Sequence, residues 1–400
     1  MEYNFDEMID RRNDKRSYSL KWTKSPVLAA ERGMNVINDE TIALFIADMD
    51  FKCAPPILEA LRGVVDHGIF GYSCLYAVPD YYDAVINWME RRHNWKIKPE
   101  ELIYVDGTVE ALKQIVLAFT EPGDGVIIQR PVYTPFSNVI NQTGRVIVNN
   151  HLLDDGSGYY EMDFDDLAEK ARDPRNKLLL LCNPHNPVGR IWTETELICL
   201  ADICRENNVI IASDEVHGDL IRVGAKFPVL ATLVDNSNII TATAVNKTFN
   251  LAGLHCTNLI IPNVELRNRF TKSFGVVLPS PFTIAAVIAA YNECENWLDE
   301  LRVYLDGTID WVLDFLHERM PKVKCCRPEG TYVMWLDFRE YGLTPEQLHS
   351  KIYHSANVIL ESGFDFDPER GGGLERICIP SSRKVIQTAI ERIAEEFKGL

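Results

Sequence analysis

Between about Leu102 and Pro262 the chain alternates short apolar runs, rich in β-branched residues, with segments of helical pattern. Apolar residues occupy consecutive positions in these runs, as expected of strands that are buried on both faces. The predicted strands are GVIIQ, RVIVNN, KLLLLC, NVIIAS, NIITAT and TNLII. Strands that alternate with helices form a mostly parallel sheet covered by helices. The alternation therefore predicts an α/β fold with a three-layer αβα arrangement.

Two of the intervening helices carry start signals. In TETELICLADICRENN, Thr193 and Glu196 have the spacing of a capping box, in which the two residues satisfy backbone N–H groups at the helix start. In DGTVEALKQIVLAF, a glycine turn precedes the helix. Ligands of such folds bind at the carboxyl ends of the strands. Functional residues are therefore expected where the predicted strands end.

The pattern changes after Pro279, and a chain of 400 residues usually forms more than one core. Segment 282–320 predicts one or two long amphipathic helices, while YVMWLDF and ERICI predict strands that are each followed by a helix. We therefore expect a large domain over residues 49–285 and a smaller α+β domain over residues 286–400. Residues 1–48 have no predicted sheet of their own and are expected to pack on the small domain.

The balance of charges limits the partners that the chain can bind. It has 41 lysines and arginines against 58 aspartates and glutamates, a formal net charge of −17, and no basic run offsets this balance. Nucleic acid and membranes are therefore not expected as partners, and no apolar run is long enough to span a bilayer. The ten cysteines form no C-x-x-C pair, and the first residues carry no apolar signal core. We expect free thiols, no metal site and a cytoplasmic location.

Polar residues follow two of the predicted strands. Asp214 comes directly after NVIIAS, where a carboxylate is costly unless it is paired. Asn183 and Asn186 lie in CNPHNPVGR, an irregular turn after KLLLLC. A structural interpretation exists for each residue, because Asp214 can cap a nearby turn and asparagines are common in turns. These residues alone do not decide between a structural and a functional role.

Three further strand ends add different side chains. Gly107 and Thr108 open a helix, whose free N–H groups and dipole suit a phosphate, although many helices begin in this way. Tyr133 lies between two prolines after GVIIQ. Lys247 follows NIITAT in the turn NKTFNLAGL, among neutral and apolar residues. This lysine is an edge residue, an ion-pair partner or an amine held for chemistry.

Taken together, these strand ends match the needs of pyridoxal phosphate (PLP). A lysine forms a Schiff base with this cofactor, and a carboxylate keeps the ring nitrogen protonated so that the ring accepts electrons. An amide can bond the ring hydroxyl, an aromatic ring can stack on the cofactor, and a helix N-terminus can bind the phosphate. One helix and one strand fit between Asp214 and Lys247. The set, in this order, indicates PLP as the cofactor.

The chain resembles fold type I PLP enzymes of the class I/II aminotransferase group, and within that group the cystathionine β-lyase subgroup of MalY/PatB-type C–S lyases. The resemblance covers nearly the whole length. Its motifs are KW near the start, IADMDF, GYS, NPHNPVGR, SDEVH, KTFNLAGL, PEGTYVMWLDF and ERICIP. The histidine that ends SDEVH distinguishes this subgroup from the many aminotransferases with tyrosine there. The resemblance implies a large PLP-binding domain and a smaller C-terminal domain.

The resemblance also implies a role for each matching residue around the cofactor. Lys247 is implied as the Schiff-base lysine and proton carrier, Asp214 as the partner of the pyridine nitrogen, and Asn186 as the partner of the ring hydroxyl and a substrate contact. Tyr133 is implied to stack on the ring. The other implied cofactor contacts are Gly107, Thr108 and Val109 at the phosphate, His217 beside the ring, and Asn246.

A substrate clamp and a shared active site are implied as well. Arg376 is implied to bind the α-carboxylate of a small amino-acid substrate, a task that suits a bidentate guanidinium; a surface ion pair is the alternative. Tyr72 is implied to reach the phosphate of a neighbouring subunit, with plain packing as the alternative. The enzyme is therefore expected to be a homodimer with shared active sites.

Two positions depart from familiar patterns. Many aminotransferases have an arginine phosphate ligand at the position of His255, and the lyase subgroup often lacks it. The subgroup usually has serine at the position of Asn246, immediately before the lysine. The amide of Asn246 can still donate a hydrogen bond, but the phosphate site is expected to be weaker or rearranged.

The reaction implied by the resemblance is the cleavage of L-cystathionine or related L-cysteine thioethers by α,β-elimination, which yields a thiol, pyruvate and ammonia. No residue alone decides between this PLP-dependent C–S β-lyase activity and transamination, so a PLP-dependent aminotransferase is the alternative. A regulatory protein is disfavoured, because such proteins usually carry a DNA-binding domain and this acidic chain shows no helix-turn-helix segment. The preferred thioether remains open among cystathionine, cystine and aryl or alkyl cysteine conjugates.

Overall fold

A seven-stranded sheet with the strand order β2-β10-β9-β8-β7-β3-β4 organises the computed structural model, which describes residues 2–31, 33–34, 36–275 and 277–400. β10 runs antiparallel to both of its neighbours, and the other pairs are parallel. This arrangement confirms the predicted α/β class with a mostly parallel sheet. In chain order the strands are β2 (Leu102–Val105), β3 (Gly125–Ile128), β4 (Val146–Asn149), β7 (Asn176–Cys182), β8 (Ile210–Asp214), β9 (Ile239–Thr243) and β10 (Thr257–Ile260).

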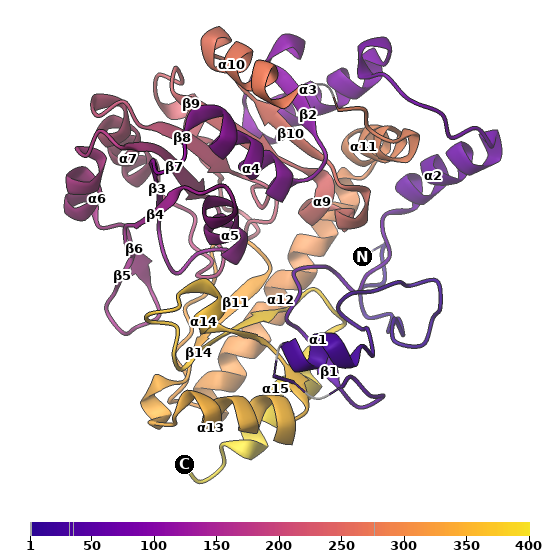
Figure 1. Ribbon diagram of the computed structural model, residues 1–400. Helices are drawn as coiled ribbons and strands as arrows, with labels where there is room; N and C mark the ends of the chain where they lie inside the picture. Colours follow the sequence, from indigo (N-terminus) through magenta and orange to yellow (C-terminus); the bar gives the residue numbers. More distant parts are fainter. Residues whose placement is uncertain (1, 32, 35, 276) are drawn as a thin grey trace.

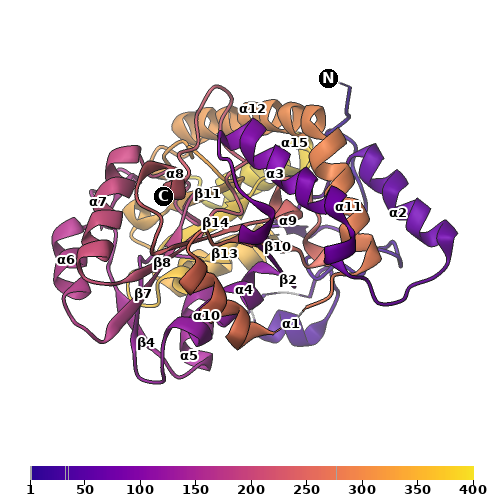
Figure 2. The ribbon, with the colours of Figure 1, turned by 90° about the horizontal axis from the view of Figure 1, so that it is seen from above.

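Consecutive residues of the central strands enter two different cores, which explains why these strands are apolar at every position. In β7, Leu178 and Leu180 pack into one core, and Leu179 and Leu181 pack into the other. Figure 2 shows the sheet with helices on both sides. Helices on the side of the first core are α4 (Thr108–Phe119), α5 (Thr134–Gln142) and α10 (Val264–Phe274). Helices on the opposite side include α6 (Phe164–Ala171), α7 (Glu194–Glu206) and α8 (Leu230–Leu233).

One predicted strand is not buried on both faces. β4 lies at the edge of the sheet beside β3. Val146 is 51% exposed, and the rest of β4 is only partly buried. The prediction of full burial for RVIVNN is therefore wrong, because an apolar run does not reveal where its strand lies in the order of the sheet.

The predicted helix signals agree with the structure. Thr193 Oγ1 accepts a hydrogen bond from Glu196 N at 3.2 Å, and Glu196 Oε2 accepts one from Thr193 N at 2.8 Å, so the capping box opens α7. Segment 282–320 forms two helices, α11 (Pro281–Glu293) and α12 (Glu295–Arg319), with Cys294 between them.

The C-terminal part adds a second, three-stranded antiparallel sheet with the order β11-β14-β13. Figure 1 shows these elements in yellow and light orange below the large sheet. Near the N-terminus, β1 (Ile42–Ala43) pairs with β12 (Val358–Ile359) of the C-terminal part. The division into domains at residues 48 and 285 stays a prediction. The elements of the C-terminal part are β11 (Val333–Asp337), η4 (Arg339–Tyr341), α13 (Pro345–His349), η5 (Ser350–Ser355), β13 (Glu361–Ser362), α14 (Gly363–Phe366), β14 (Leu374–Cys378) and α15 (Arg383–Glu396).

The remaining elements precede β2 or lie between strands of the large sheet. All ten cysteines are free thiols. Within the described part of the chain, no helix has the combination of length and apolar composition that crossing a membrane requires. These remaining elements are α1 (Pro26–Glu31), α2 (Pro55–His67), η1 (Leu75–Ala77), α3 (Pro79–His93), η2 (Pro99–Glu101), β5 (Leu153–Asp154), β6 (Tyr160–Glu161), α9 (Val245–Thr248) and η3 (Ala252–Leu254).

Candidate active site

Lys247 lies in α9, the short helix that follows β9 at the carboxyl edge of the sheet. Its Nζ donates a hydrogen bond to the carbonyl oxygen of Ala47 at 2.8 Å. The same oxygen accepts a hydrogen bond from the Tyr332 hydroxyl at 2.9 Å. Burial and the nearby Arg376 guanidinium lower the pKa of the Lys247 amine. A lysine with a lowered pKa holds more of its amine uncharged near neutral pH, as nucleophilic or basic chemistry requires.

Asp214 is the last residue of β8, in register with Cys182 on one side and Ala242 on the other. Its side chain is buried, and among the described residues its carboxylate accepts a hydrogen bond only from Val216 N, at 3.3 Å. Burial raises the pKa of Asp214 to about 6, with a smaller opposing effect from Val216 N and Lys247. A carboxylate held in this way favours a cationic partner.

Asn186 and Arg376 meet in the interior. The Arg376 Nη1 donates a hydrogen bond to Asn186 Oδ1 at 3.0 Å, and Tyr133 N donates one to the Asn186 carbonyl oxygen at 3.0 Å. Asn186 and Arg376 are buried, while Tyr133 is partly exposed. Burial, together with the charge of Asp214, raises the pKa of Tyr133 to about 12, so its phenol is neutral near physiological pH.

His217 lies in the turn after β8 and packs edge-on against Tyr332, with ring centroids 5.4 Å apart. Burial, reinforced by the charges of Lys247 and Arg376, lowers the pKa of His217 well below its usual value. Its Nδ1 is buried and has no hydrogen-bond partner among the described residues. The imidazole is therefore neutral in this environment.

The N-terminus of α4 forms a separate corner of the site. Gly107 has φ +100°, and a side chain there would meet His255 Nδ1 at 3.7 Å. The hydroxyl oxygens of Thr108 and Thr257 are hydrogen-bonded at 2.8 Å. Cys256, the residue before Thr257, donates a hydrogen bond from its backbone N–H to Asn246 Oδ1 at 3.4 Å. These contacts connect the start of α4 to the turn that carries Lys247. The free N–H groups at the start of α4 can bind an anion.

The structure thus brings most of the predicted residues together. A cavity of about 720 Å³ is lined by Lys247, Tyr133 and Arg376. Val109 is partly exposed at the start of α4. Tyr72 is the exception, because it is 99% exposed and no hydrogen bond joins it to the other site residues within the described part of the chain.

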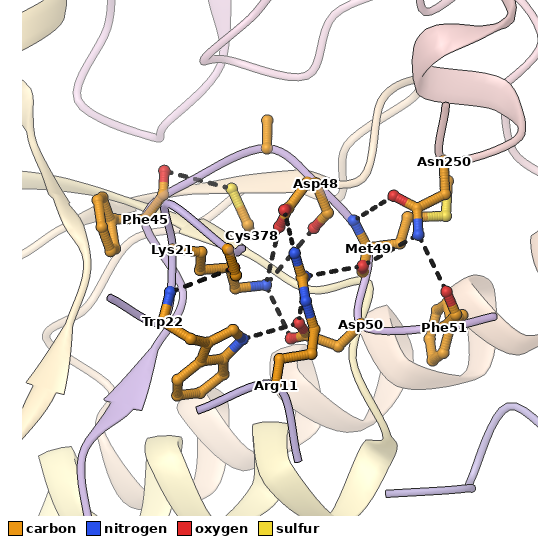
Figure 3. Close-up of polar contacts among 12 residues, drawn as sticks. Arg11, Lys21, Trp22, Phe45, Asp48, Met49, Asp50, Phe51, Asn250 and Cys378 are labelled. Atoms are coloured by element: carbon orange, nitrogen blue, oxygen red, sulfur yellow. Dashed lines mark hydrogen bonds and ion pairs between the residues drawn. The ribbon is translucent and has the colours of Figure 1, made fainter. Parts of the chain in front are cut away.

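Sequence reasoning assigned no role to the IADMDF motif or to Phe45 before it, which form segment 45–51. Figure 3 shows the contacts of this segment with Arg11, Lys21 and Trp22 of the N-terminal part and with Asn250. Asp50 accepts hydrogen bonds from Lys21 Nζ at 2.7 Å, Arg11 Nη1 at 2.7 Å and Trp22 Nε1 at 2.9 Å. Arg11 Nη2 also pairs with Asp48 at 2.8 Å. The KW motif therefore holds segment 45–51 through buried ion pairs.

Lys21 is fully buried in this network. Burial alone would lower the pKa of its amine, but the charges of Asp50 and Asp48 outweigh this effect and the pKa is raised. The positive charges of Lys21 and Arg11, in turn, lower the pKa of Asp50 despite its burial. Both partners are therefore ionised. Removing Lys21 would leave the buried Asp50 with Arg11 as its remaining cationic partner, and removing Asp50 would leave the buried Lys21 with Asp48, 3.4 Å away.

The other side of segment 45–51 faces the site. Asn250, in the turn after α9, accepts a hydrogen bond from Met49 N at 3.1 Å and donates to the carbonyl oxygens of Met49 at 3.1 Å and Phe51 at 2.9 Å (Figure 3). The Phe45 carbonyl oxygen accepts a hydrogen bond from Arg376 Nη2 at 2.6 Å. Two carbonyl groups of the segment, at Phe45 and Ala47, therefore hold Arg376 and Lys247.

Glu361 was also missed. Its carboxylate forms an ion pair with the guanidinium of Arg376, and the two residues lie opposite each other on the paired strands β13 and β14. Glu361 also lines the cavity that contains Lys247 and Arg376. A lone glutamate after an apolar run carries no sequence signal of this kind. Tyr332, by contrast, lies within the PEGTYVMWLDF motif. The motif identified this segment as part of the family resemblance, but it did not predict the hydrogen bond between the Tyr332 hydroxyl and the Ala47 carbonyl oxygen.

The arrangement offers an amine and a guanidinium in one cavity, a buried carboxylate whose charge acts on that amine, and an anion-binding helix start connected to the turn that carries the amine. A family model for aminotransferases of class I and II matches residues 40–393. The chain belongs to the aminotransferase class I and II family. The match confirms the resemblance predicted from the motifs.

Relatives within the class I and II family support a narrower likeness. The chain is 40% identical to cystathionine beta-lyase PatB of Bacillus subtilis over 397 residues, which cover 98% of each chain. It is 29% identical to protein MalY of Escherichia coli over 359 residues, 89% of this chain and 91% of MalY. The crystal structure of cystalysin from Treponema denticola, which contains a pyridoxal 5'-phosphate cofactor, superposes with a TM-score of 0.92 at 36% identity, covering 100% of this chain and 99% of cystalysin.

Proposed function

We propose that this protein is a PLP-dependent C–S β-lyase that cleaves L-cystathionine or related L-cysteine thioethers. The observation that carries the proposal is the cavity that both the Lys247 amine and the Arg376 guanidinium line. The buried Asp214 carboxylate interacts electrostatically with Lys247. A cavity with this charge arrangement suits an α-amino acid, because Arg376 matches the carboxylate and Lys247 lies where the amino group would react.

The residues present fit PLP on two observations. Asp214 has a buried carboxylate with a single backbone donor among the described residues, so it can hold a protonated ring nitrogen. Gly107 leaves the start of α4 free of a side chain, so that a phosphate can approach the N–H groups of Thr108 and Val109. Lys247 would bond covalently to the cofactor. The other contacts proposed for the cofactor are Asn186, Tyr133, His217 and Asn246.

When bound, PLP withdraws electrons from Cα of the amino acid and so acidifies the Cα–H bond. Lys247 Nζ takes this proton as the general base, a role that suits an amine with a lowered pKa. Arg376, held by Asn186 and by the Phe45 carbonyl oxygen, orients the carboxylate. Overall, a thioether and one water give a thiol, pyruvate and ammonia, so atoms balance without an oxidant.

The relatives favour elimination over transamination. Cystathionine beta-lyase PatB shares 40% of its residues with this chain, whereas the aspartate aminotransferase of Bacillus sp. strain YM-2 shares 24%. A PLP-bound C–S lyase from Staphylococcus hominis superposes with a TM-score of 0.90 at 31% identity, covering 100% of this chain and 99% of that one. An aminotransferase is the second candidate, because it needs the same lysine, carboxylate and arginine.

The test is product stoichiometry with L-cystathionine as the sole substrate. A lyase releases pyruvate and homocysteine together over many turnovers, with no added oxo acid. An aminotransferase requires an added oxo acid and releases no thiol. Slow half-transamination does not contradict the proposal, since every step before the departure of the thiolate is common to both reactions.

We also propose a homodimer located in the cytoplasm. Tyr72 lies on the connection after α2, which extends from the rest of the molecule in Figure 1. Ile69, Phe70 and Tyr76 on the same connection are exposed too, and an exposed apolar cluster of this kind is typical of an interface. A second subunit would cover this cluster and place Tyr72 near the phosphate of its site. The free thiols fit a reducing compartment.

A further inference from the structure

The Lys247 amine reaches the cavity from α9, a helix of only 4 residues. A single helical turn is not stable by itself, because its formation orders several residues for one backbone hydrogen bond. α9 has such a bond from Phe249 N to the Val245 carbonyl oxygen, at 3.0 Å. The orientation of Lys247 therefore depends on side-chain contacts that hold α9 in place.

Thr248, the residue after Lys247, provides a contact of this kind. Adjacent residues of a helix point about 100° apart, so the Thr248 side chain is directed away from that of Lys247. Thr248 is fully buried, and its hydroxyl donates a hydrogen bond to Asp219 Oδ2 at 2.9 Å. Hydrogen bonds to an ionised carboxylate are roughly twice as strong as those between neutral groups. Asp219 is therefore a strong anchor for α9.

Asp219 is itself held by side chains of α3. Trp88 Nε1 donates a hydrogen bond to Asp219 Oδ1 at 3.1 Å, and His93 Nε2 lies 2.8 Å from the same oxygen. Trp88 is fully buried and stacks on Tyr291, with ring centroids 4.9 Å apart. Burial alone would raise the pKa of Asp219, but the interactions with His93 and Thr248 outweigh this effect and lower it. The carboxylate is therefore ionised near neutral pH and fixed in position.

Asp219 also belongs to the segment that begins at Asp214. The turn between them is closed by a hydrogen bond from Gly218 N to the Glu215 carbonyl oxygen at 2.8 Å. Asp214 ends β8, and Lys247 follows the neighbouring strand β9. The bond from α9 to Asp219 therefore joins the segment that carries the buried carboxylate to the helix that carries the amine.

We propose that Asp219 is a positioning residue that acts through the Thr248 hydroxyl and fixes the orientation of the Lys247 amine. Neither Asp219 nor Thr248 is among the described residues that line the cavity. The inference rests on the proposed function for the role of Lys247, but it concerns the placement of the amine and not the choice of reaction. Because Arg376 is held by other contacts, a loosened α9 should impair proton transfer and leave the binding of the substrate carboxylate intact.

Thr248→Val tests this role, since it removes the hydroxyl and keeps the shape of the side chain. In this variant kcat for L-cystathionine should fall by about tenfold, as expected when a reacting group is slightly misplaced, while KM changes by less than about twofold. Thr248→Ser restores the hydroxyl and should keep kcat within about twofold of the wild type, even though the loss of a buried methyl group lowers the urea midpoint. The pair separates an effect on position from an effect on stability.

A second readout does not depend on turnover. In the full-length cofactor-free protein, acetylation of Lys247 by acetic anhydride is followed by peptide mass spectrometry as a function of pH. Burial lowers the pKa of this amine, so an α9 that moves toward water should shift the labelling midpoint upward. The shift is expected in Thr248→Val and not in Thr248→Ser.

Thr308→Val is a matched control. Thr308 lies in α12 and is as deeply buried as Thr248, and its hydroxyl accepts a hydrogen bond from Arg383 Nε at 3.2 Å. This variant should have a lower urea midpoint and an unchanged kcat and labelling midpoint. Asp219→Ala should lower kcat at least as much as Thr248→Val, and combining the two should cause no further loss, because both remove the same contact. If Asp219→Ala does not fold, the Val and Ser variants of Thr248 still decide.

The outcomes separate this inference from the proposed function. An unchanged labelling midpoint in Thr248→Val, or an equal loss of kcat in the Val and Ser variants, would overturn the inference. If L-cystathionine yields no pyruvate but the labelling midpoint shifts in Thr248→Val alone, the lyase proposal fails and the role of Asp219 stands. If pyruvate is released and Thr248→Val changes neither kcat nor the midpoint, the lyase proposal stands and the role of Asp219 fails.

Discussion

At the scale of single residues, Lys247 carries the strongest expectation. Lys247→Ala should lower turnover of L-cystathionine by at least about a thousandfold, since both the covalent attachment and the general base are removed. The purified wild-type protein should be yellow, and borohydride should fix the cofactor to the peptide that contains Lys247. Peptide mapping by mass spectrometry checks this. A label on Lys272, which lies on α10 away from the cavity, would show the assignment to be wrong.

Asp214 predicts a pH-dependent stability of the cofactor-free protein. Its pKa rises from an ordinary 3.8 to about 6 on burial, so between these values the folded state keeps a proton that the unfolded state has lost. Stability therefore falls as the pH rises through this window, and the penalty is complete above about pH 6. Its size is on the order of 3 kcal/mol, at 1.36 kcal/mol per pKa unit.

Asp214→Asn removes this penalty because the amide does not ionise. Urea unfolding of the cofactor-free protein should show the variant to be more stable than the wild type at pH 8, and the gain should vanish near pH 4. The same variant should lose nearly all turnover, because the ring nitrogen loses its anionic partner. A gain of equal size at both pH values would contradict the assigned shift.

At the scale of elements, segment 45–51 depends on Lys21. Lys21→Met should destabilise the protein by about 1–3 kcal/mol, because the buried Asp50 loses one of its two cationic partners and keeps only Arg11. Adding Asp50→Asn should recover part of this loss, and urea unfolding of the two single variants and the double variant measures the coupling. Lys24→Met is a matched control, since it removes an exposed pair with Asp39 and should leave the urea midpoint unchanged.

The elements also show what periodicity can and cannot predict. β7 and β8 were predictable because apolar residues at every position require two covered faces, and Asp214 stood out because it ended such a run. The edge position of β4 was not predictable, since the order of strands in a sheet depends on long-range pairing. The same limit hid the contact of Ala47 with Lys247 and that of Glu361 with Arg376. Both join segments whose crossing is decided by the whole fold.

At the scale of the whole molecule, the proposed dimer predicts that defects in two different chains complement each other. In a hybrid of a Tyr72→Phe chain and a Lys247→Ala chain, one site has both residues intact and the other has both altered. Co-expressed hybrids should therefore retain more cofactor on dialysis, and turn over faster, than the average of the two variants. An active protein that sediments as a monomer at assay concentration would contradict the shared site.

Pairing between distant parts of the chain has a consequence for how the protein is made. β1 pairs with β12, Asp50 N donates to the carbonyl oxygen of Pro380 at 2.9 Å, and Phe45 holds Arg376. A ribosome releases the N-terminal partners of these contacts hundreds of residues before the C-terminal ones. Through most of synthesis the apolar segment around Phe45 lacks its final neighbours and is open to chaperones and to aggregation. Assembly of the catalytic pocket is therefore a late event, completed only when translation has nearly finished.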